Sequence, residues 1–404
     1  MTQFHGEPSG SVTAGGAILR RLRRLGVDLV FVNPGTDFPP IIEGLAEAEA
    51  QQADLPLVLV VGHEHAAMGM AHGYYLATGR AQAVILHTNV GLANGATAAI
   101  NAASDHVPIL LMSGRTPTVE SGRFGSRTVP IGWGQEMRDQ AALVREVTKW
   151  DYELRFPEQV GELLDRGYAI ANSTPRGPVY LSLPREVLCE SCPLPALDAE
   201  IAMYSAVITA ADSAVAQAGE LLSSAERPLI VAQRGAGTGA GFDALARLAE
   251  KWSIPVCQYW AVANAISAEH PMYIGDDPGP WIAEADVVLV IDSLAPWVPG
   301  THILADDCQV IQLGPDPLHS QVPVRNFRTN LAVTTEIGPG LEALEAKMRE
   351  LDDRAADARR LRRTVIDDHV VVNRLRLASF AAVRVETDLS KAYVSRCIGE
   401  AGEG

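Results

Sequence analysis

The sequence has no excess of basic residues, since 33 Lys and Arg stand against 49 Asp and Glu, for a net charge of −16. Phosphate binding is driven by clustered Lys and Arg, so this balance argues against a nucleic-acid partner. The sequence also lacks a run of about 20 apolar residues that would span a bilayer, and its first residues have neither a basic start nor an apolar stretch. We therefore expect a cytoplasmic protein without a membrane partner.

Cysteine is scarce, and 5 residues in a chain of 404 do not make a disulfide framework. Cys189 and Cys192 form a single CxxC with no second pair and no nearby His ligand, so we interpret this motif as structural. His63 and His65 flank Glu64, but their spacing differs from the HExxH pattern of zinc enzymes. We expect no metal ligands within this chain.

What the sequence does contain is an alternation of short apolar runs and helical patterns, in a chain long enough for two domains of about 150–200 residues. Nearly continuous apolar runs are typical of buried parallel strands, which predicts a parallel sheet covered by helices over residues 12–187. The expected strands lie at 28–32, 55–61, 81–88, 107–114 and 177–184. The expected helices lie at 17–25, 40–50, 64–78, 96–104 and 157–171.

A stretch with prolines and acids at 188–207 is typical of a linker, and a second α/β set follows it. This second domain, 208–345, is expected to have strands at 228–234, 254–260, 286–293 and 308–315. Residues 346–404 are helical by pattern and rich in both signs of charge, which predicts a solvated helical linker. The fold class is therefore α/β, with two doubly wound, mostly parallel-sheet domains, the second Rossmann-like, and a C-terminal helical linker.

Glu64 directly follows the expected strand at 55–61 and opens the expected helix at 64–78. Parallel α/β sheets bind ligands at the carboxyl ends of their strands, so Glu64 is the first candidate functional residue. We expect its strand to be central and its carboxylate to be partly desolvated. The alternative is an acid that merely favours the helix N-terminus through the helix dipole.

Four motifs follow one another along the first domain: VNPGTDFP at 32–39, GHEHAAMGMAHGYYLATG at 62–79, VILHTNVGLANGATAAINAASDHVPILLMSG at 84–114 and PRGPVYLSLPREV at 175–187. Together they resemble the pyrimidine-binding domain of acetolactate synthase and benzoylformate decarboxylase. RPLIVAQRGAG at 227–237 and VIQLGPDPLHSQVPVRNF at 310–327 resemble the central domain of the same thiamine-diphosphate-dependent enzymes. The resemblance covers nearly the whole chain and implies a 2-oxo-acid decarboxylase or carboligase.

The resemblance implies roles for two residues in catalysis. Glu64 matches the family glutamate that hydrogen-bonds N1′ of the aminopyrimidine ring and thereby activates the cofactor. His87 falls where benzoylformate decarboxylase has an active-site histidine, and a neutral imidazole there is able to relay a proton after CO2 loss. The alternative for His87 is a structural hydrogen bond to the backbone.

The resemblance also implies cofactor and substrate contacts. In addition to Glu64, the expected cofactor-binding residues are Pro34, Gly35, Thr88 and Asn94. On the substrate side, Thr36 aligns with a small hydroxyl residue, and Gln135 lies in a segment that resembles a substrate-side loop of the synthases. Arg115 stands where related synthases often carry glutamine, and its planar fork would bind a substrate carboxylate unless it simply faces solvent. His87 completes the expected substrate residues.

A glycine turn in the second domain raises the question of a nucleotide. GAGTGA at 235–240 follows an expected strand and precedes a helix, but the acid that should follow the next strand is missing. FAD, which some acetolactate synthases hold in this domain, stays open as an additional cofactor. The alternative is a turn that closes a strand against a helix.

The family holds the diphosphate through Mg2+, bound by a GDG motif and a downstream asparagine, and this sequence has no such pair. The resemblance therefore implies that a separate polypeptide with the diphosphate-binding domain supplies the Mg2+ ligands, in a homo- or hetero-oligomer. The 346–404 linker would lead toward that missing domain. The expected function is a subunit of a split thiamine-diphosphate-dependent enzyme that acts on a small 2-oxo acid. A non-catalytic scaffold or regulatory homologue and an artificially shortened chain stay open as alternatives.

Overall fold

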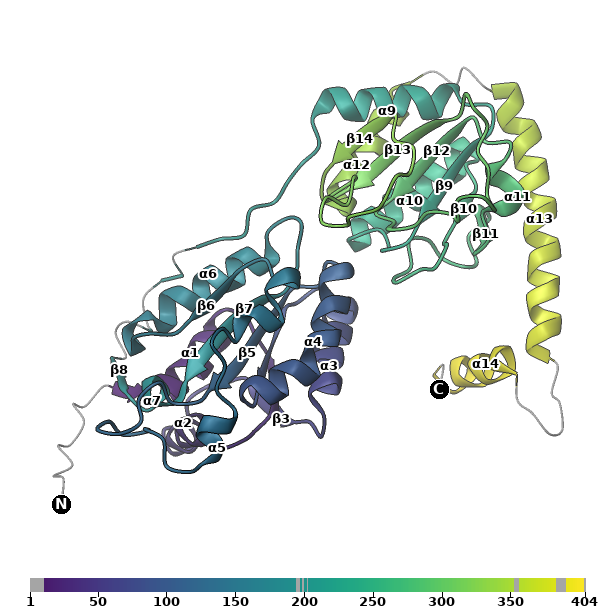
Figure 1. The fold of residues 1–404 in the computed structure, drawn as a ribbon. Coiled ribbons are helices and arrows are strands. Elements are labelled where there is room, and N and C mark those ends of the chain that lie inside the picture. The colour runs from purple at the N-terminus through teal and green to yellow at the C-terminus, as the bar shows by residue number, and fades with distance from the viewer. Residues whose placement is uncertain are drawn as a thin grey trace. The chain divides into compact units, whose positions relative to one another are not determined.

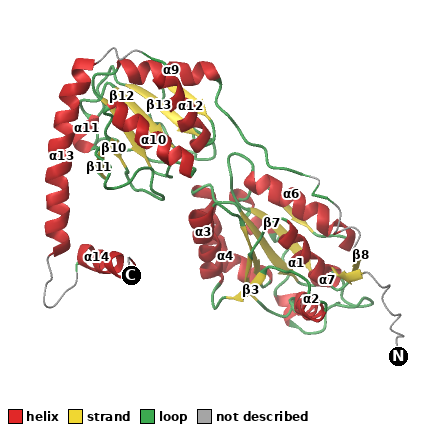
Figure 2. Ribbon diagram, turned by 180° about the vertical axis from the view of Figure 1, so that it is seen from behind, coloured by secondary structure: helices red, strands yellow, loops and turns green. Residues whose placement is uncertain are grey.

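The computed structural model describes residues 11–193, 197, 200–201, 203–351, 356–382 and 390–402. The chain divides into two compact units between Val207 and Ile208 (Figure 1). Each unit holds a six-stranded parallel sheet with helices packed on it, so the predicted α/β class with two doubly wound domains is confirmed (Figure 2). Within the described ranges, no helix combines the length and the apolar character needed to cross a membrane.

The sheet of the first unit has the spatial order β3-β2-β4-β5-β7-β6, and all its strand pairs are parallel. Its strands are β2 (Leu29–Asn33), β3 (Leu57–Val60), β4 (Gln82–Leu86), β5 (Ile109–Arg115), β6 (Asp151–Glu153) and β7 (Val179–Pro184). Every residue of β4 is buried, as expected for a strand covered on both faces. The strand order reverses between β2 and β4, and such a switch point leaves a crevice at the carboxyl ends of the two strands.

Helices cover both faces of this sheet (Figure 2). They are α1 (Ala14–Arg24), α2 (Pro39–Ala50), α3 (Glu64–Thr78), α4 (Thr88–Ser104), α5 (Ile131–Gly134), α6 (Val160–Asn172) and α7 (Arg185–Leu188), with 3-10 turns at Ala141–Leu143, Arg145–Val147 and Pro157–Gln159. One apolar core joins α1 and α6 to one face of the sheet, and a second joins α3 and α4 to the other. Alternate residues of β2 and β4 enter the two cores, because successive side chains of a strand point to opposite faces.

The start of α3 is set by its cap. His63 has an extended backbone, and its Nδ1 accepts the backbone N–H of His65 at 3.1 Å. The helix ends at Gly79, whose φ of 70° lies in the left-handed region that favours glycine. Glu64 is therefore fixed as the first residue of α3, with its carboxylate close to the positive end of the helix dipole.

The first unit extends into the expected linker. β1 (Ser11–Thr13) pairs antiparallel with β8 (Ser191–Pro193), within the 188–207 segment predicted as a linker. The reason is apolar packing, because Cys192 is fully buried in the core of the first unit, as is Val12 of β1. The Cys192 side chain is thus part of the apolar core of the first unit.

The second unit has the spatial order β11-β10-β9-β12-β13-β14, with parallel pairing throughout. Its strands are β9 (Pro228–Ala232), β10 (Val256–Cys257), β11 (Tyr273–Gly275), β12 (Val287–Ile291), β13 (Gln309–Gly314) and β14 (Leu331–Thr334). Its helices are α9 (Asp212–Ser224), α10 (Gly239–Trp252), α11 (Gly279–Ile282), α12 (Ile337–Arg349), α13 (Ala356–Ala382) and α14 (Lys391–Gly402). The switch point of this sheet lies between β9 and β12, as in Rossmann folds.

Two expectations about the first unit are corrected. β3 is an edge strand, not a central one, and its Leu57 and Val60 are exposed. The helix predicted at 96–104 begins at Thr88, so residues 88–95 form its first two turns. Glycine and asparagine in this stretch lower its intrinsic helix propensity, and packing of α4 against α3 and β5 overrides that preference.

Candidate functional site

Asp37 and His87 meet at the switch point of the first sheet. Asp37 lies in the loop after β2, and His87 directly follows β4. The Nδ1 atom of His87 lies 2.5 Å from Oδ1 of Asp37, whose side chain is 3% exposed. The second carboxylate oxygen accepts the backbone N–H of Thr88 at 3.4 Å. The sequence indicates Asp37 only as a turn residue, so the structure adds a buried acid to the predicted His87.

Two glycines make room for this pair. At Gly114 in β5, an added Cβ atom would overlap the Asp37 carboxylate, and at Gly35 it would overlap the imidazole ring of His87. A side chain at either position would displace the acid or the ring. Gly35, predicted to contact the cofactor, thus lies against His87, whereas Pro34, predicted for the same role, is exposed in the loop.

The environment of His87 favours the charged ring. The hydrogen bond to Asp37 raises the pKa of His87 above its ordinary value and outweighs the opposing effect of burial, and the charges of Asp37 and Glu64 add to the increase. The ring therefore holds its proton more strongly than an isolated imidazole does, and the predicted proton relay through His87 stays a prediction. Because Asp37 engages Nδ1, a ligand would exchange a proton with Nε2.

Glu64 lies below the surface, and its residue is 8% exposed. Its Oε2 accepts a hydrogen bond from Nδ2 of Asn94 in α4, at 3.1 Å. A Cβ atom at Gly91 would lie 3.3 Å from Oε1, so this glycine lets α4 pass close to the carboxylate. Two of the predicted cofactor residues, Glu64 and Asn94, are thus in direct contact.

Thr88 opens α4 with a φ of 41°, in the left-handed region that branched side chains rarely adopt. Its Oγ1 is buried, as is Oδ1 of the neighbouring Asn89, and neither atom has a hydrogen-bond partner among the described residues. Strained backbone and unsatisfied buried polar atoms concentrate at functional sites. The start of α4 therefore has the properties of a ligand-binding segment.

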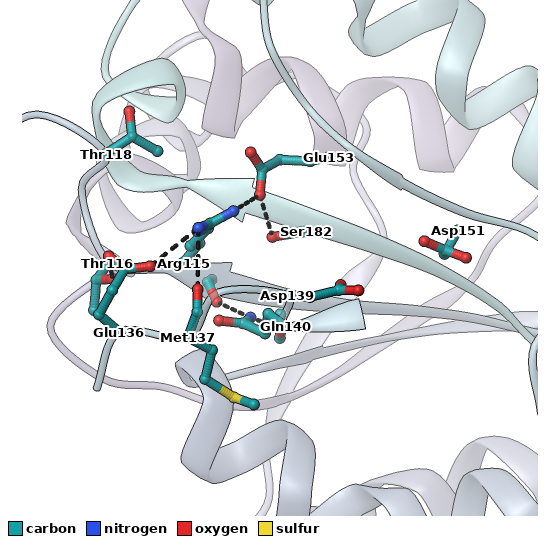
Figure 3. Close-up of polar contacts among 12 residues, drawn as sticks. Arg115, Thr116, Thr118, Glu136, Met137, Asp139, Gln140, Asp151, Glu153 and Ser182 are labelled. Carbon is teal, nitrogen blue, oxygen red and sulfur yellow. Dashed lines mark hydrogen bonds and ion pairs between the residues drawn. The ribbon is translucent and has the colours of Figure 1, made fainter. Parts of the chain in front are cut away.

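Arg115 at the end of β5 is held by two carboxylates (Figure 3). Its guanidinium forms ion pairs with Glu153 of β6 and with Glu136, whose Oε1 lies 3.0 Å away. Glu136 also accepts a hydrogen bond from Thr116 at 2.8 Å and pairs with Arg127. Burial alone would raise the pKa of Glu136, but these partners hold it below its ordinary value. Arg115 therefore does not simply face solvent, and its predicted contact with a substrate carboxylate stays a prediction.

A small recess beside the Asp37–His87 pair brings most of the predicted substrate residues together. Its lining includes Thr36, Thr88, Arg115, Arg127, Gln135 and Arg185. The loops that follow β2 and β5 thus converge on one place in the first unit. The hydroxyl of Thr36 and the amide of Gln135 add neutral hydrogen-bonding groups to its walls.

The glycine turn of the second unit is accounted for by packing. Gly237 has a φ of 77°, and a Cβ atom there would lie 2.7 Å from the backbone nitrogen of Gly338 in α12. At Gly241 it would lie 2.6 Å from Cα of Gly338. These glycines let the β9–α10 turn and α10 approach α12 closely. The turn thus has a structural explanation, and an FAD site there stays a prediction.

The fold and the site define an α/β protein that presents a buried carboxylate and an acid–imidazole pair where parallel sheets bind ligands. Residues 12–143 match the family model of the N-terminal TPP binding domain of thiamine pyrophosphate enzymes. Residues 215–344 match the model of the central domain of the same enzymes. The two matches together cover well over half of the chain. The chain belongs to the thiamine-diphosphate-dependent enzyme superfamily.

Comparisons with individual proteins support this family assignment. A probable 2-ketoarginine decarboxylase of Pseudomonas aeruginosa is 32% identical over 295 residues, which are 70% of this chain and 49% of that protein. A probable acetolactate synthase large subunit of Methanocaldococcus jannaschii is 25% identical over 83% of this chain and 57% of its own length. The crystal structure of a thiamin diphosphate-dependent enzyme from Mycobacterium smegmatis, 25% identical, superimposes with a TM-score of 0.68 over 85% of this chain and 64% of that one. The chain spans about half the length of the two relatives.

Proposed function

We propose that this chain provides the pyrimidine side of a thiamine-diphosphate site that acts on a 2-oxo acid, by decarboxylation, carboligation or both. The observation that carries the proposal is the Glu64 carboxylate, buried at the start of α3 and hydrogen-bonded to Asn94. Membership of the superfamily supports an enzyme of this class. The names of the two relatives differ in substrate, so the substrate has to be argued from this chain's own residues.

The residues around Glu64 fit the aminopyrimidine end of the cofactor. Gly91 leaves space beside Oε1 of Glu64, and the buried oxygens of Thr88 and Asn89 lack partners among the described residues. Thiamine diphosphate, when bound, supplies a nucleophilic carbon that adds to the ketone of a 2-oxo acid and accepts the electrons released with CO2. Glu64 holds a proton at N1′ of the pyrimidine, and Asn94 keeps the carboxylate in place.

His87 moves a second proton in this proposal. The charged ring donates from Nε2 to the substrate carbon after loss of CO2, and Asp37 orients the ring and stabilises its charge. The raised pKa of His87 supports a proton donor near neutral pH. Because they have no side chain, Gly35 and Gly114 leave the space in which the His87 ring and the Asp37 carboxylate lie against each other.

We further propose that a diphosphate-binding domain on another polypeptide completes the site, in a homo- or hetero-oligomer. Within the described ranges, no group of three or more His, Cys, Asp or Glu side chains is arranged to hold a metal ion. In the proposal, Mg2+ at the diphosphate takes its oxygen ligands from that partner. The competing hypothesis of a scaffold or regulatory homologue predicts no turnover with any such partner.

The test of the catalytic proposal is Glu64→Gln in the complex reconstituted with a diphosphate-domain partner. Glutamine keeps the shape of the side chain but cannot exchange a proton with N1′, so turnover of a 2-oxo acid should fall by about a hundredfold or more. Glu345→Gln is the matched control, because Glu345 is a buried glutamate of α12 in the second unit. Turnover in the Glu64→Gln complex equal to that of the control would overturn the mechanism.

A calorimetric titration of the purified chain tests the split arrangement. Without the partner, the contacts to thiamine diphosphate are one carboxylate hydrogen bond and apolar packing, and the net charge of −16 repels the diphosphate. We expect weak binding at best, and restoration of tight, Mg2+-dependent binding when the partner is added. Tight Mg2+-dependent binding by the chain alone would contradict the split.

A further inference from the structure

Arg185 is a cation without a counter-ion in the recess of the first unit. It is the first residue of α7, directly after β7, and its half-buried side chain lines the recess. The side chain has no hydrogen bond or ion pair with any residue that the structure describes. A guanidinium carries five N–H donors, and those of Arg185 have no protein acceptor among the described residues, so only water or a ligand is left to accept them. This arrangement calls for an anionic ligand.

The other charges at the recess are already balanced. Arg115 and Arg127 pair with Glu136, and Arg115 also pairs with Glu153. Asp37, the acid among the lining residues, is engaged by Nδ1 of His87 at 2.5 Å. The positive charge of Arg185 is therefore the one in the described lining that no neighbouring carboxylate offsets, in a chain whose overall charge is −16.

Two further polar atoms of the lining residues are unsatisfied. Nε of Arg115 and Oγ1 of Thr88 are buried and have no hydrogen-bond partner among the described residues. Both side chains line the same recess as Arg185. An acceptor group in the recess would pair with the guanidinium of Arg185, and with Nε of Arg115 once that buried atom turns toward the ligand.

We propose that Arg185 binds a second anionic group of the substrate, so that the substrate is a 2-oxo acid with a carboxylate at its far end. This inference rests on the proposed function, because Thr88 and the Asp37–His87 pair adjoin the recess. The carboxylate at C1 is a poorer occupant, because it leaves as CO2 and holding it through an ion pair would stabilise the ground state. Val129 and Ile131 in the recess wall would pack against the methylene carbons between the two acid groups.

The charge of Arg185 also sets what the recess rejects. A 2-oxo acid with a cationic end would meet like charge from Arg185, and one with an apolar end would leave its guanidinium unsatisfied. Discrimination against an analogue that lacks the charged group is a general property of sites built to hydrogen-bond it. Arg185 is thus a specificity-determining residue.

The test measures binding of two probes of matched length to the full chain, without cofactor, by ligand-observed NMR titration. The probes are 2-oxoglutarate, which has the second carboxylate, and 2-oxopentanoate, which lacks it. One charge-assisted pair predicts that 2-oxoglutarate binds on the order of 10-fold more tightly. Arg185→Gln should remove this preference, and Arg185→Lys should keep part of it. Arg138→Gln, which removes an exposed arginine outside the recess lining, should keep all of it.

Three outcomes would overturn the assignment: equal affinity of the wild-type chain for the two probes, an undiminished preference in Arg185→Gln, or no binding of 2-oxoglutarate up to about 10 mM. Thermal unfolding of each variant checks that Arg185→Gln still folds, and Arg185→Lys keeps the test informative if it does not. Because no turnover is measured, the result is separable from the proposed function. If the chain prefers 2-oxoglutarate but its reconstituted complex has no activity, the proposed catalysis is contradicted and the anion site is still supported.

Discussion

The two sheets have the same size and the same parallel pairing, but their switch points are filled differently. In the first unit, the crevice between β2 and β4 holds the Asp37–His87 pair, beside a recess. In the second, between β9 and β12, Arg234 and Asp292 form a buried ion pair at 3.3 Å. Arg325 donates to backbone carbonyl groups of the loop after β12, and burial together with the charge of Arg234 lowers its pKa to about 10. The charged side chains at the second crevice thus bind to one another and to backbone groups of the same unit.

Glycine makes room for different groups in the two units. Gly114 leaves space for the carboxylate of a side chain, whereas Gly237 leaves space for the backbone of α12. A glycine-rich turn after a strand is therefore ambiguous as a marker of a ligand site. The more informative marker in this chain is a buried acid beside an imidazole.

The largest expected effect concerns His87→Ala, which removes the proton donor from the first switch point. In the reconstituted complex, turnover should fall on the order of a hundredfold, with little change in cofactor affinity. Stopped-flow turnover and calorimetric cofactor titration separate the two quantities. Arg234→Ala, at the second switch point, should instead destabilise the second unit through loss of a buried pair. If His87→Ala lowers turnover and cofactor affinity in parallel, or changes neither, then His87 is structural. The proposed difference between a catalytic first switch point and a structural second one would then be wrong.

An intermediate effect is expected from Gly114→Ala and Gly237→Ala. Each adds a methyl group where the structure has no space, so each should lower the free energy of unfolding by about 1–3 kcal/mol. Only Gly114→Ala should also shift the NMR signals of the His87 ring, because it displaces Asp37. The control is Gly73→Ala in α3, where an added Cβ atom meets nothing within 4 Å and helix propensity favours alanine. Equal perturbation of His87 by both variants would refute the separation of the two sites.

The smallest effect concerns pH. The folded-state pKa of His87 is raised, so its protonation stabilises the fold in full below its unfolded value of about 6.5, and this contribution is lost as pH rises through the folded pKa. Urea unfolding at several pH values should therefore show a wild-type contribution that Asp37→Asn lacks. The variant keeps a hydrogen-bonding side chain but not the charge, and the NMR-measured pKa of His87 should fall. An unchanged His87 pKa in Asp37→Asn would show that Asp37 is not the cause.

The strands that could be predicted from the sequence are those whose burial on both faces gives a continuous apolar run. The continuous apolar runs of β4, β5 and β7 predicted their positions to within a few residues. The edge strand β6 (Asp151–Glu153) was missed, because three polar or aromatic residues give no periodic signal. β3 was expected at the centre, because its apolar residues resemble those of a buried strand, although Leu57 is 60% and Val60 is 74% exposed.

The site could be predicted only where a motif carries the information. Glu64 and His87 were proposed from the resemblance, whereas Asp37 was missed because an aspartate in a turn has ordinary local uses. Its partner lies 50 residues away, and nothing local connects the two. Arg185 was missed for a similar reason, because the absence of a counter-ion is a property of the folded recess and not of the residues beside it in the chain.

The contact between Gly114 and Asp37 also limits the order in which this sequence can change. Alanine at position 114 collides with the carboxylate while Asp37 is present; once Asp37 has become alanine the carboxylate is gone, and the closest remaining atom of residue 37 is its Cβ at 2.8 Å, so the collision is reduced but not removed. The two substitutions are therefore coupled, and the double variant should be more stable than the sum of the single effects. A lineage that drifts away from this site loses the acid first and the glycine second, because the reverse path passes through an unstable intermediate sequence.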